Sequence, residues 1–310
     1  MTEQKVKEKD VVIIGAGIAG LTAALYAGRM KLDTLVLENA LVGGQIANAA
    51  GIENYPGFLS VSGAELMKTV KAQAEKYGAV VDEFDEISRM DLTGRDKYIY
   101  TDDGIYKAKA VILASGMQRR RLALPEAARL EDKGVHFCEL CDGYRYQDRV
   151  VAVAGGGNAA VDAAKMLAKY ARKIYLVHRS ELRADPASQE EIRQNPKIEI
   201  MLHTDIVGLK GDSWLSGILI RNKDTGEEKE LPAEGLFVNI GVIPNNQLFR
   251  DQVPLDGDGR ILAGEDCRTS LPGVFAAGDI RSKEVRQLTT AAADGTVAAT
   301  LAEKYIQSLG

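Results

Sequence analysis

A run of apolar residues at positions 10–14 leads into a glycine-rich turn, and a stretch of helical character follows it. The turn carries Gly15, Gly17 and Gly20, and residues 21–30 are rich in Ala and Leu. This order predicts a strand, a tight turn and a helix. In such a unit the glycines let the backbone approach a pyrophosphate, whose charge lies at the helix N-terminus.

An acid ends the next apolar run. Residues 34–37 are followed by Glu38, at the distance where a carboxylate accepts a hydrogen bond from a ribose hydroxyl. The carboxylate disfavours a 2′-phosphate. The first unit is therefore predicted to bind FAD or NAD.

The same order returns in the middle of the chain. The second unit starts at Arg149 with the apolar residues 150–154, a turn with Gly155, Gly157, Asn158 and Ala160 follows, and residues 161–170 are helix-like. The first glycines of the two turns are 155 − 15 = 140 residues apart. Such repetition predicts that one binding architecture is used twice.

The second unit differs where the nucleotide is selected. Its second apolar run, residues 173–177, ends in His178 and Arg179 rather than in an acid, and Arg183 follows. Cations at this place favour a phosphorylated ribose. Solvated surface charge is the alternative interpretation of Arg179 and Arg183.

Both units continue through short β-rich segments to apolar strands that end in glycine, at residues 110–116 and 236–241. The last third then returns to the first unit: an apolar run at 274–277 ends in Gly278 and Asp279, and residues 287–305 have a helical pattern. Asp279 is placed to bind a sugar-like hydroxyl or to act as a cap or turn residue, and the two roles are compatible.

Length and charge narrow the function further. A chain of 310 residues suits two domains. Its 39 basic and 44 acidic residues give a net charge of −5, which argues against nucleic-acid binding. Residues 1–10 lack the apolar run of a secretory signal, and no segment has the length of a membrane span. With only three cysteines, the expected location is the cytoplasm.

Two cysteines, Cys138 and Cys141, are followed directly by Asp142. Such a pair can close a small disulfide, bind half of a metal site, or lie inert in a core. A zinc site needs four ligands, and the remaining candidates, Cys267, His136, His178 and His203, form no second pair at ligand spacing, so no metal is predicted. The charged neighbours Glu139 and Asp142 disfavour an inert pair. A redox-active dithiol is the leading interpretation.

Over essentially its whole length the chain resembles the low-molecular-weight, bacterial-type thioredoxin reductases, class II of the pyridine nucleotide-disulfide oxidoreductases. Several motifs in the right order carry the resemblance, which is more specific than any one of them. They are the Gly15 to Gly20 turn, Gly43-Gly44-Gln45, Glu53-Asn54-Tyr55-Pro56-Gly57, Cys138-x-x-Cys141-Asp142-Gly143, the Gly155 to Ala160 turn, Val274-Phe-Ala-Ala-Gly278-Asp279 and Arg286-Gln287.

The resemblance implies an α/β fold with two Rossmann-like dinucleotide-binding domains of the three-layer ββα type, the second inserted in the first. Residues 1–116 and 243–310 would form a discontinuous FAD-binding domain, and residues 117–242 an NAD(P)-binding domain that carries the dithiol. The family forms homodimers. Because dithiol and nicotinamide need the same region of the flavin, the inserted domain would swivel about Ser115-Gly116 and residues 241–244.

The resemblance also implies two sets of cofactor-binding residues. The expected FAD set is Gly15, Gly17, Gly20, Glu38, Gly43, Gly44, Gln45, Asn54, Gly278, Asp279, Arg286 and Gln287. The expected NAD(P) set is Gly155, Gly157, Asn158, Ala160, His178, Arg179 and Arg183. The helix that Gln287 opens would direct its positive end at the flavin.

The implied enzyme is a thioredoxin-disulfide reductase with FAD and NADPH or NADH. Cys141 would face the flavin and accept its electrons, Cys138 would attack the disulfide of a thioredoxin-like partner, and Asp142 would move the proton. Cys267 matches no motif of the family and is taken as a structural thiol.

One departure from the family leaves the electron donor open. NADP-specific members carry His-Arg-Arg, three residues, then Arg, whereas this chain has Ser180 for the second Arg and one residue fewer before Arg183. NADPH, NADH or another donor are all compatible with this. Two alternatives remain: a related flavin disulfide reductase with another donor or partner, and a non-enzymatic flavin redox sensor.

Overall fold

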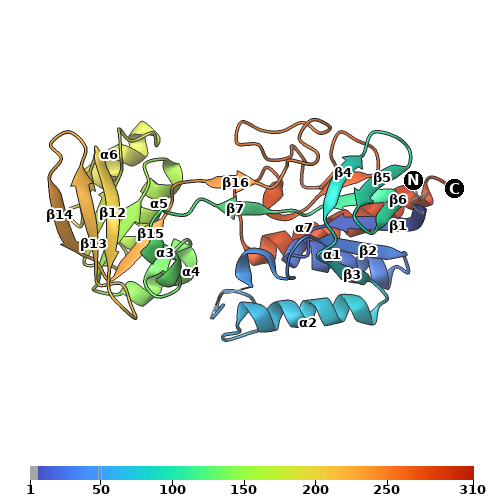
Figure 1. Ribbon diagram of the computed structural model, residues 1–310, viewed down its shortest axis with the longest axis horizontal. Coiled ribbons are helices and arrows are strands. Elements are labelled where there is room, and N and C mark those ends of the chain that lie inside the picture. The colour runs from blue at the N-terminus through green and yellow to red at the C-terminus, as the bar shows by residue number, and fades with distance from the viewer. Residues whose placement is uncertain (1–5, 48, 50) are drawn as a thin grey trace. The chain divides into compact units, whose positions relative to one another are not determined.

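The computed structural model describes residues 6–47, 49 and 51–310, so part of the N-terminal segment considered above, residues 1–5, lies outside the described residues. The chain divides into two compact units. The first consists of residues 1–118 and 243–310, and the second, residues 119–242, interrupts it (Figure 1). The chain leaves the first unit after residue 118, whereas the sequence analysis placed this boundary after residue 116.

The first unit is built on one sheet with helices on one face (Figure 1). Its strand order is β3-β2-β1-β6-β5-β4, and β17 also pairs with β6. Strands β1, β2, β3, β6 and β17 run parallel, whereas β4 and β5 are antiparallel. The elements are β1 (Val6–Ile14), α1 (Ile18–Arg29), β2 (Thr34–Glu38), η1 (Gly44–Ile46), α2 (Gly63–Lys76), β3 (Val80–Glu83), β4 (Ile87–Asp91), β5 (Lys97–Thr101), β6 (Gly104–Leu113), β17 (Val274–Ala276), η3 (Gly278–Ile280) and α7 (Leu288–Gln307).

The end of β1 is buried on both faces, which explains why this run is continuously apolar rather than alternating. Val11 and Ile13 pack with α1, α2 and α7. Val12 and Ile14 face a second cluster, which includes residues of β4 and β5 and the segment around Phe249. The first glycine turn follows at the end of this strand.

Strand β1 begins at Val6, four residues before the predicted start. Residues 6–9 are mostly exposed and charged, so they carry no apolar signal. They become a strand because they pair with β6, and the cross-strand neighbours Glu8 and Lys107 form an ion pair of 3.2 Å. Pairing with a distant segment decided this boundary.

The second unit has a parallel sheet, an antiparallel sheet and helices (Figure 1). The parallel sheet has the order β11-β10-β9-β15-β8, and the antiparallel sheet the order β12-β13-β14. The elements are α3 (Pro125–Arg129), β8 (Val135–His136), α4 (Glu139–Asp142), η2 (Gly143–Tyr146), β9 (Val150–Ala154), α5 (Asn158–Leu167), β10 (Lys173–Val177), α6 (Pro186–Gln194), β11 (Ile198–Met201), β12 (Thr204–Lys210), β13 (Gly217–Asn222), β14 (Glu228–Pro232) and β15 (Gly235–Val238).

Alternate residues of β9 define the layers of this unit. Val151 and Val153 pack with the helical side, where α5 contributes Val161. Ala152 and Ala154 pack with the antiparallel sheet. The order helix, parallel sheet, antiparallel sheet agrees with the predicted α/β fold of the ββα type.

The two connections between the units, β7 (Met117–Arg119) and β16 (Val242–Pro244), form a two-stranded sheet. Three hydrogen bonds tie Asn245 to the residues before β7. The Ser115 hydroxyl donates to the Asn245 carbonyl at 2.7 Å, the Asn245 side chain donates to the Ser115 carbonyl at 2.8 Å, and the Asn245 N–H donates to the Gly116 carbonyl at 3.1 Å. The connections are therefore held to each other. In the described part of the chain, no helix is long and apolar enough to cross a membrane.

Candidate active site

The three glycines of the first turn have different structural tasks. Gly15 has φ +105°, and a Cβ there would lie 2.5 Å from the Ala114 carbonyl oxygen. A Cβ at Gly20 would overlap the Gly15 carbonyl oxygen. At Gly17, by contrast, no described atom lies within 4 Å of the Cβ position. Tight turn, open approach and close helix packing are the three properties that a pyrophosphate-binding turn requires.

Glu38 ends β2 beside this turn. Its Oε2 accepts a hydrogen bond from the Ala16 N–H at 2.9 Å, and its Oε1 accepts one from the Ala40 N–H at 3.1 Å. A carboxylate has about four acceptor positions, so Glu38 can still accept a ribose hydroxyl. Glu38 thus also holds the first glycine turn at Ala16 and the loop that follows β2 at Ala40.

Gly43, Gly44 and Gln45 lie against the same turn. The Gly43 N–H donates to the Ala16 carbonyl at 3.2 Å, and a Cβ on Gly44 would lie 3.4 Å from the Gly17 Cα. The Gln45 side chain donates to the Met117 carbonyl at 3.0 Å. The structure therefore brings these residues together with the first glycine turn.

The C-terminal segment adds a second group to this unit. The Asn54 side chain donates to the Gln287 side chain at 3.2 Å, across 233 positions of sequence. Gln287 is the N-cap of α7 and forms a capping box with Thr290. Gly278 and Asp279 begin η3 directly after β17. Asn54 and the start of α7 are thus neighbours.

Arg286 is the residue of this group that most needs a ligand. Its Nε is buried and has no hydrogen-bond partner among the described residues. Burial, with a smaller contribution from Arg260, lowers the pKa of Arg286, although Asp279 acts against this. A half-buried guanidinium with an unsatisfied nitrogen fits an electron-rich group such as a phosphate or an aromatic cofactor.

A buried ion cluster behind η3 gave no signal in the sequence. Asp294 of α7 accepts from Arg281 at 2.9 Å, from Lys283 at 2.7 Å and from the Gly278 N–H at 3.0 Å. Asp294 is 6% exposed. Asp294 holds Gly278 and hence the segment that carries Asp279. The sequence analysis missed it, because a single acid in an Ala- and Thr-rich helix carries no motif.

The second glycine turn repeats the first. Gly155 has φ +145°, and a Cβ there would overlap the Asn239 carbonyl oxygen. No described atom lies within 4 Å of the Cβ position at Gly157, whereas Ala160 is fully buried against the turn. The Asn158 side chain accepts from the Asp185 N–H at 2.8 Å, so it helps to hold the loop before α6.

His178, Arg179 and Arg183 gather beside this turn. The His178 ring lies over Gly156, where a Cβ would overlap it, and the Arg183 N–H donates to the Gly156 carbonyl at 2.7 Å. Burial lowers the pKa of His178, as do the charges of Arg183 and Arg179. Neither guanidinium forms a hydrogen bond or ion pair with the described residues, so both are available to an anion.

Ser180, at the position of the family's second Arg, contacts His178. Its Oγ is 3.3 Å from the His178 Nε2. Glu181 is hydrogen-bonded to the exposed His203 at 2.9 Å. The loop therefore offers two guanidinium groups, not three.

Cys138 and Cys141 form a disulfide, with their Cα atoms 5.3 Å apart. Cys138 is the N-cap of α4, and its carbonyl accepts from the N–H groups of Cys141 at 3.2 Å and Asp142 at 3.1 Å. The predicted disulfide is thus present.

Asp142 lies between two basic side chains. Its Oδ2 is 3.4 Å from the His136 Nδ1, and its Oδ1 is 3.4 Å from an Arg145 guanidinium nitrogen. The His136 Nε2 is 2.6 Å from the Tyr146 hydroxyl. His136 entered the sequence analysis only as a zinc candidate, but the structure places it behind the acid of the dithiol motif.

Other reactive or acidic groups lie apart from these sites. Cys267 is fully buried in the first unit, and burial raises the pKa of its thiol to about 12. Carboxylate oxygens of Asp82, Asp85 and Asp103 lie within 4.8 Å of one another. The pKa of the nearby Lys7 is raised, first by Tyr106 and further by Asp103 and Asp85.

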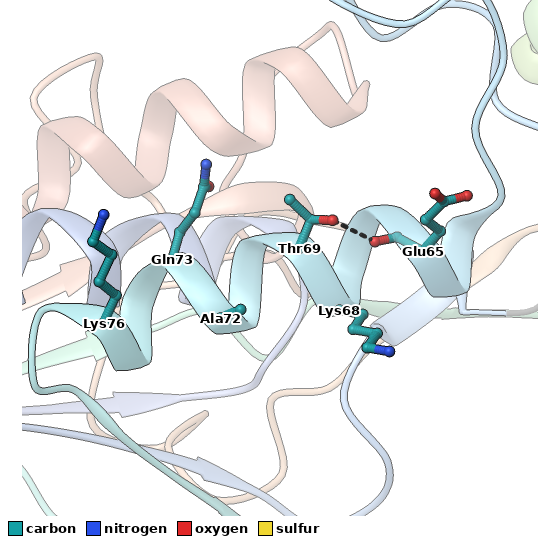
Figure 2. A pocket seen from close by; sticks show the side chains of 6 residues that line it. All are labelled: Glu65, Lys68, Thr69, Ala72, Gln73 and Lys76. Atoms are coloured by element: carbon teal, nitrogen blue, oxygen red, sulfur yellow. Dashed lines mark hydrogen bonds between the residues drawn. The ribbon is translucent and has the colours of Figure 1, made fainter.

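A hollow on the surface of α2 is separate from all of these groups. Figure 2 shows that its lining comes from this one helix, and the Thr69 hydroxyl within it donates to the Glu65 carbonyl at 2.9 Å. The lining residues are Glu65, Lys68, Thr69, Ala72, Gln73 and Lys76. They include no cysteine, histidine or glycine turn, and we assign no chemistry to this hollow.

Comparison with known proteins gave consistent matches. The family model described as pyridine nucleotide-disulphide oxidoreductase matches residues 9–295. A "34.2 kDa protein in rubredoxin operon" of Clostridium pasteurianum is 48% identical over 97% of this chain and 98% of its own length. A thioredoxin reductase of Peptoclostridium acidaminophilum is 43% identical over 96% and 97%. The crystal structure of a thioredoxin reductase of Streptococcus pyogenes matches with a TM-score of 0.93 and 36% identity, over 97% and 99% of the chains.

Proposed function

The chain belongs to the pyridine nucleotide-disulphide oxidoreductase family, and we propose that it is a flavoprotein thioredoxin-disulfide reductase that passes electrons from NAD(P)H through FAD to the Cys138–Cys141 disulfide. The observation that carries the proposal is this disulfide with its adjacent acid, in a chain that has two dinucleotide-binding turns. Relatives of 37–43% identity carry the name thioredoxin reductase.

FAD fits the first unit. Gly15, Gly17 and Gly20 would hold its pyrophosphate, and Glu38 its ribose. Arg286, with an unsatisfied buried nitrogen, would face the electron-rich part of the cofactor. The remaining contacts would come from Gly43, Gly44, Gln45, Asn54, Gly278, Asp279 and Gln287. The N-terminus of α7 would stabilise nearby negative charge by about 0.3–1 kcal/mol.

NADPH or NADH would bind the second unit. Gly155, Gly157, Asn158 and Ala160 would form the pyrophosphate turn. His178, Arg179 and Arg183 would lie beside the ribose. When bound, FAD takes a hydride from the nicotinamide and supplies two electrons to the disulfide.

The two sulfurs would then have separate tasks. Cys141 accepts the electrons, and the Cys138–Cys141 bond breaks. The Cys138 thiolate attacks one sulfur of the partner's disulfide, and the other partner sulfur leaves as a thiolate. The Cys141 thiolate next attacks Cys138, which restores the internal disulfide and releases the reduced partner. Asp142 supplies the proton that a leaving sulfur takes up.

We further propose that the two units change their relative placement during turnover, because dithiol and nicotinamide each need the flavin. Gly116 and Gly241 have φ values of +63° and +109°, which only glycine adopts readily. The bonds between Asn245 and Ser115 limit such a motion to one that moves both connections together.

A second candidate differs only in the electron donor. Ser180 contacts His178 instead of offering a third guanidinium, and this favours a weakened preference for NADPH. NADH, or a donor other than a nicotinamide, would then reduce the same flavin. A homodimer and a reducing, cytoplasmic location complete the proposal, and sedimentation of the purified protein tests the former.

The deciding experiment measures turnover of purified, FAD-loaded protein with NADPH or NADH and a panel of thioredoxin-like proteins. We expect steady thioredoxin reduction with at least one nucleotide, and none in Cys141→Ser. Flavin reduction by neither nucleotide, while dithionite-reduced protein still reduces thioredoxin, would support the other-donor candidate. Failure of both steps would refute the reductase.

A further inference from the structure

A buried histidine contacts Asp142, the acid that follows the redox disulfide. His136 belongs to β8, two residues before Cys138, and is 1% exposed. Its ring packs against the rings of Tyr146 and Phe237, with centroids 5.5 and 5.4 Å away. Packing alone does not explain a histidine here, because an apolar ring would fill the same space.

The two nitrogens of His136 face different partners. Nε2 is 2.6 Å from the Tyr146 hydroxyl. Nδ1 is buried, makes no hydrogen bond to the described residues, and lies 3.4 Å from the Asp142 carboxylate. A buried polar atom without a hydrogen bond is costly, and such atoms call for an explanation. A proton that Nδ1 and Asp142 share when the dithiol is reduced would explain this atom.

The tautomer follows from these contacts. Burial and the nearby Asp142 raise the pKa of Tyr146, so its hydroxyl keeps its proton. When Tyr146 donates to Nε2, the neutral ring carries its proton on Nδ1, toward Asp142. When the ring is charged, both nitrogens are donors, and Tyr146 accepts.

The other charges around the ring come from three segments. Arg145 of η2 contacts the outer oxygen of Asp142. Asp132, in the turn before β8, has a pKa raised by burial and by Asp142, and lowered by His136, Arg145 and Arg119. Glu234, before β15, acts on Tyr146. Asp142 is the carboxylate in closest contact with the ring.

We propose that His136 is a positioning residue for the dithiol, which shares one proton with Asp142 and thereby sets the pH at which Cys138 and Cys141 react. In the exchange step the leaving sulfur takes up the shared proton through Asp142, which leaves a carboxylate and a neutral imidazole. The pair takes up one proton from solvent before the next exchange. The electron pairs move only between sulfurs, so the step is balanced.

This inference rests on the proposed function for its meaning, but its test does not need thioredoxin. The holoprotein is reduced with dithiothreitol, freed of reductant, and alkylated with iodoacetamide between pH 5 and 9. The rates of Cys138 and Cys141 are read by mass spectrometry. If His136 and Asp142 share a proton, the wild-type profile should contain one inflection more than the two thiols account for.

Two variants separate titration from packing. His136→Phe keeps the ring but no nitrogen, and His136→Asn keeps an N–H donor that does not titrate. Both should lose the additional inflection, and His136→Phe should change the rate at pH 6 by about ten- to a hundred-fold, the range for a hydrogen bond to a charged group. Tyr146→Phe should shift the inflection without removing it.

His203→Asn is the matched control, because this exposed histidine also contacts carboxylates. Its profile should coincide with wild type. Flavin content and thermal midpoint show whether each variant is folded, and His136→Asn keeps the test open if His136→Phe is not. Profiles of both His136 variants that are parallel to wild type at every pH would overturn the inference, whether or not the protein reduces thioredoxin.

Discussion

At the scale of single residues, the two cysteines of the disulfide have unequal positions. Cys138 stands before α4 and caps it, whereas Cys141 lies within the helix next to Asp142. A nucleophile for an external disulfide must be reachable by a partner, and an electron acceptor must face the flavin. The proposed function gives these two residues of the same type different chemistry: Cys138 would attack the partner's disulfide, and Cys141 would accept the electrons.

We expect Cys138→Ser to leave Cys141 as a thiolate beside oxidised flavin, with a long-wavelength charge-transfer band, and Cys141→Ser to lack this band. Both variants should lose reduction of protein disulfides, because one thiol cannot complete the exchange. Absorption spectra and turnover measure the two effects. The band in the wrong variant, or near-normal turnover in either, would refute the assignment.

The second prediction at this scale concerns Arg179. With Ser180 in place of an arginine, we expect NADPH to be used with weaker discrimination against NADH than a complete set of arginines gives. One hydrogen bond to a charged group is worth about 1.5–3 kcal/mol, so one lost contact costs about ten- to a hundred-fold in preference.

The ratio of kcat/KM for NADPH and NADH tests this in wild type and in Arg179→Ala. The ratio should fall in the variant, while kcat/KM for NADH stays within a few-fold. Lys223→Ala is a control, because its ammonium donates to the main-chain carbonyl of Arg179, at 3.4 Å. An unchanged ratio in Arg179→Ala would contradict this account of the site.

At the scale of elements, the close contact of α1 and α7 positions the cofactor-binding segments. A Cβ on Gly295 of α7 would overlap the Ala19 carbonyl oxygen and lie 3.0 Å from the Ala23 nitrogen. Helix α1 begins after the first glycine turn, and α7 begins at Gln287. Because Gly295 has no side chain, α1 and α7 can pack closely, and the starts of both helices can contribute to one site.

We therefore expect Gly295→Ala to destabilise the protein by about 1–3 kcal/mol, because backbone atoms of α1 must move. Thermal unfolding should shift by about 2–4 °C for each kcal/mol. The flavin content after purification should fall as well. Gly257→Ala is the control, since no described atom lies within 4 Å of its Cβ position. Equal midpoints for the two variants would rule out the tight helix contact.

At the scale of the whole molecule, FAD is expected to act as part of the folded first unit. A ligand that binds only the native state at 100 times its Kd adds about 2.7 kcal/mol of stability. The purified protein should be yellow, release FAD on denaturation, and unfold at lower temperature once FAD is removed. Readdition of FAD should restore the midpoint. A colourless, folded preparation that takes up no FAD would exclude the proposed cofactor.

Much of this architecture is written in local sequence. Glycines in the first and second turns are needed because a Cβ would collide with the neighbouring backbone or block a ligand. Buried parallel strands need continuous apolar runs. The predicted strand ends at Glu38 and His178 therefore agree with the structure, and the Cys-x-x-Cys spacing predicted a disulfide that the fold contains.

Only the tertiary structure decided which residues contact these motifs. Residues 6–9 became a strand through pairing with β6, and Asp294 met Arg281 and Lys283 from another segment. His136 contacts Asp142 because its ring, at the end of β8, is buried against Phe237 of the distant strand β15 while α4 begins three residues later. Local sequence determines backbone conformation. The partner of a buried charge depends instead on how distant segments pack, and no periodicity or residue spacing in the sequence predicts that packing.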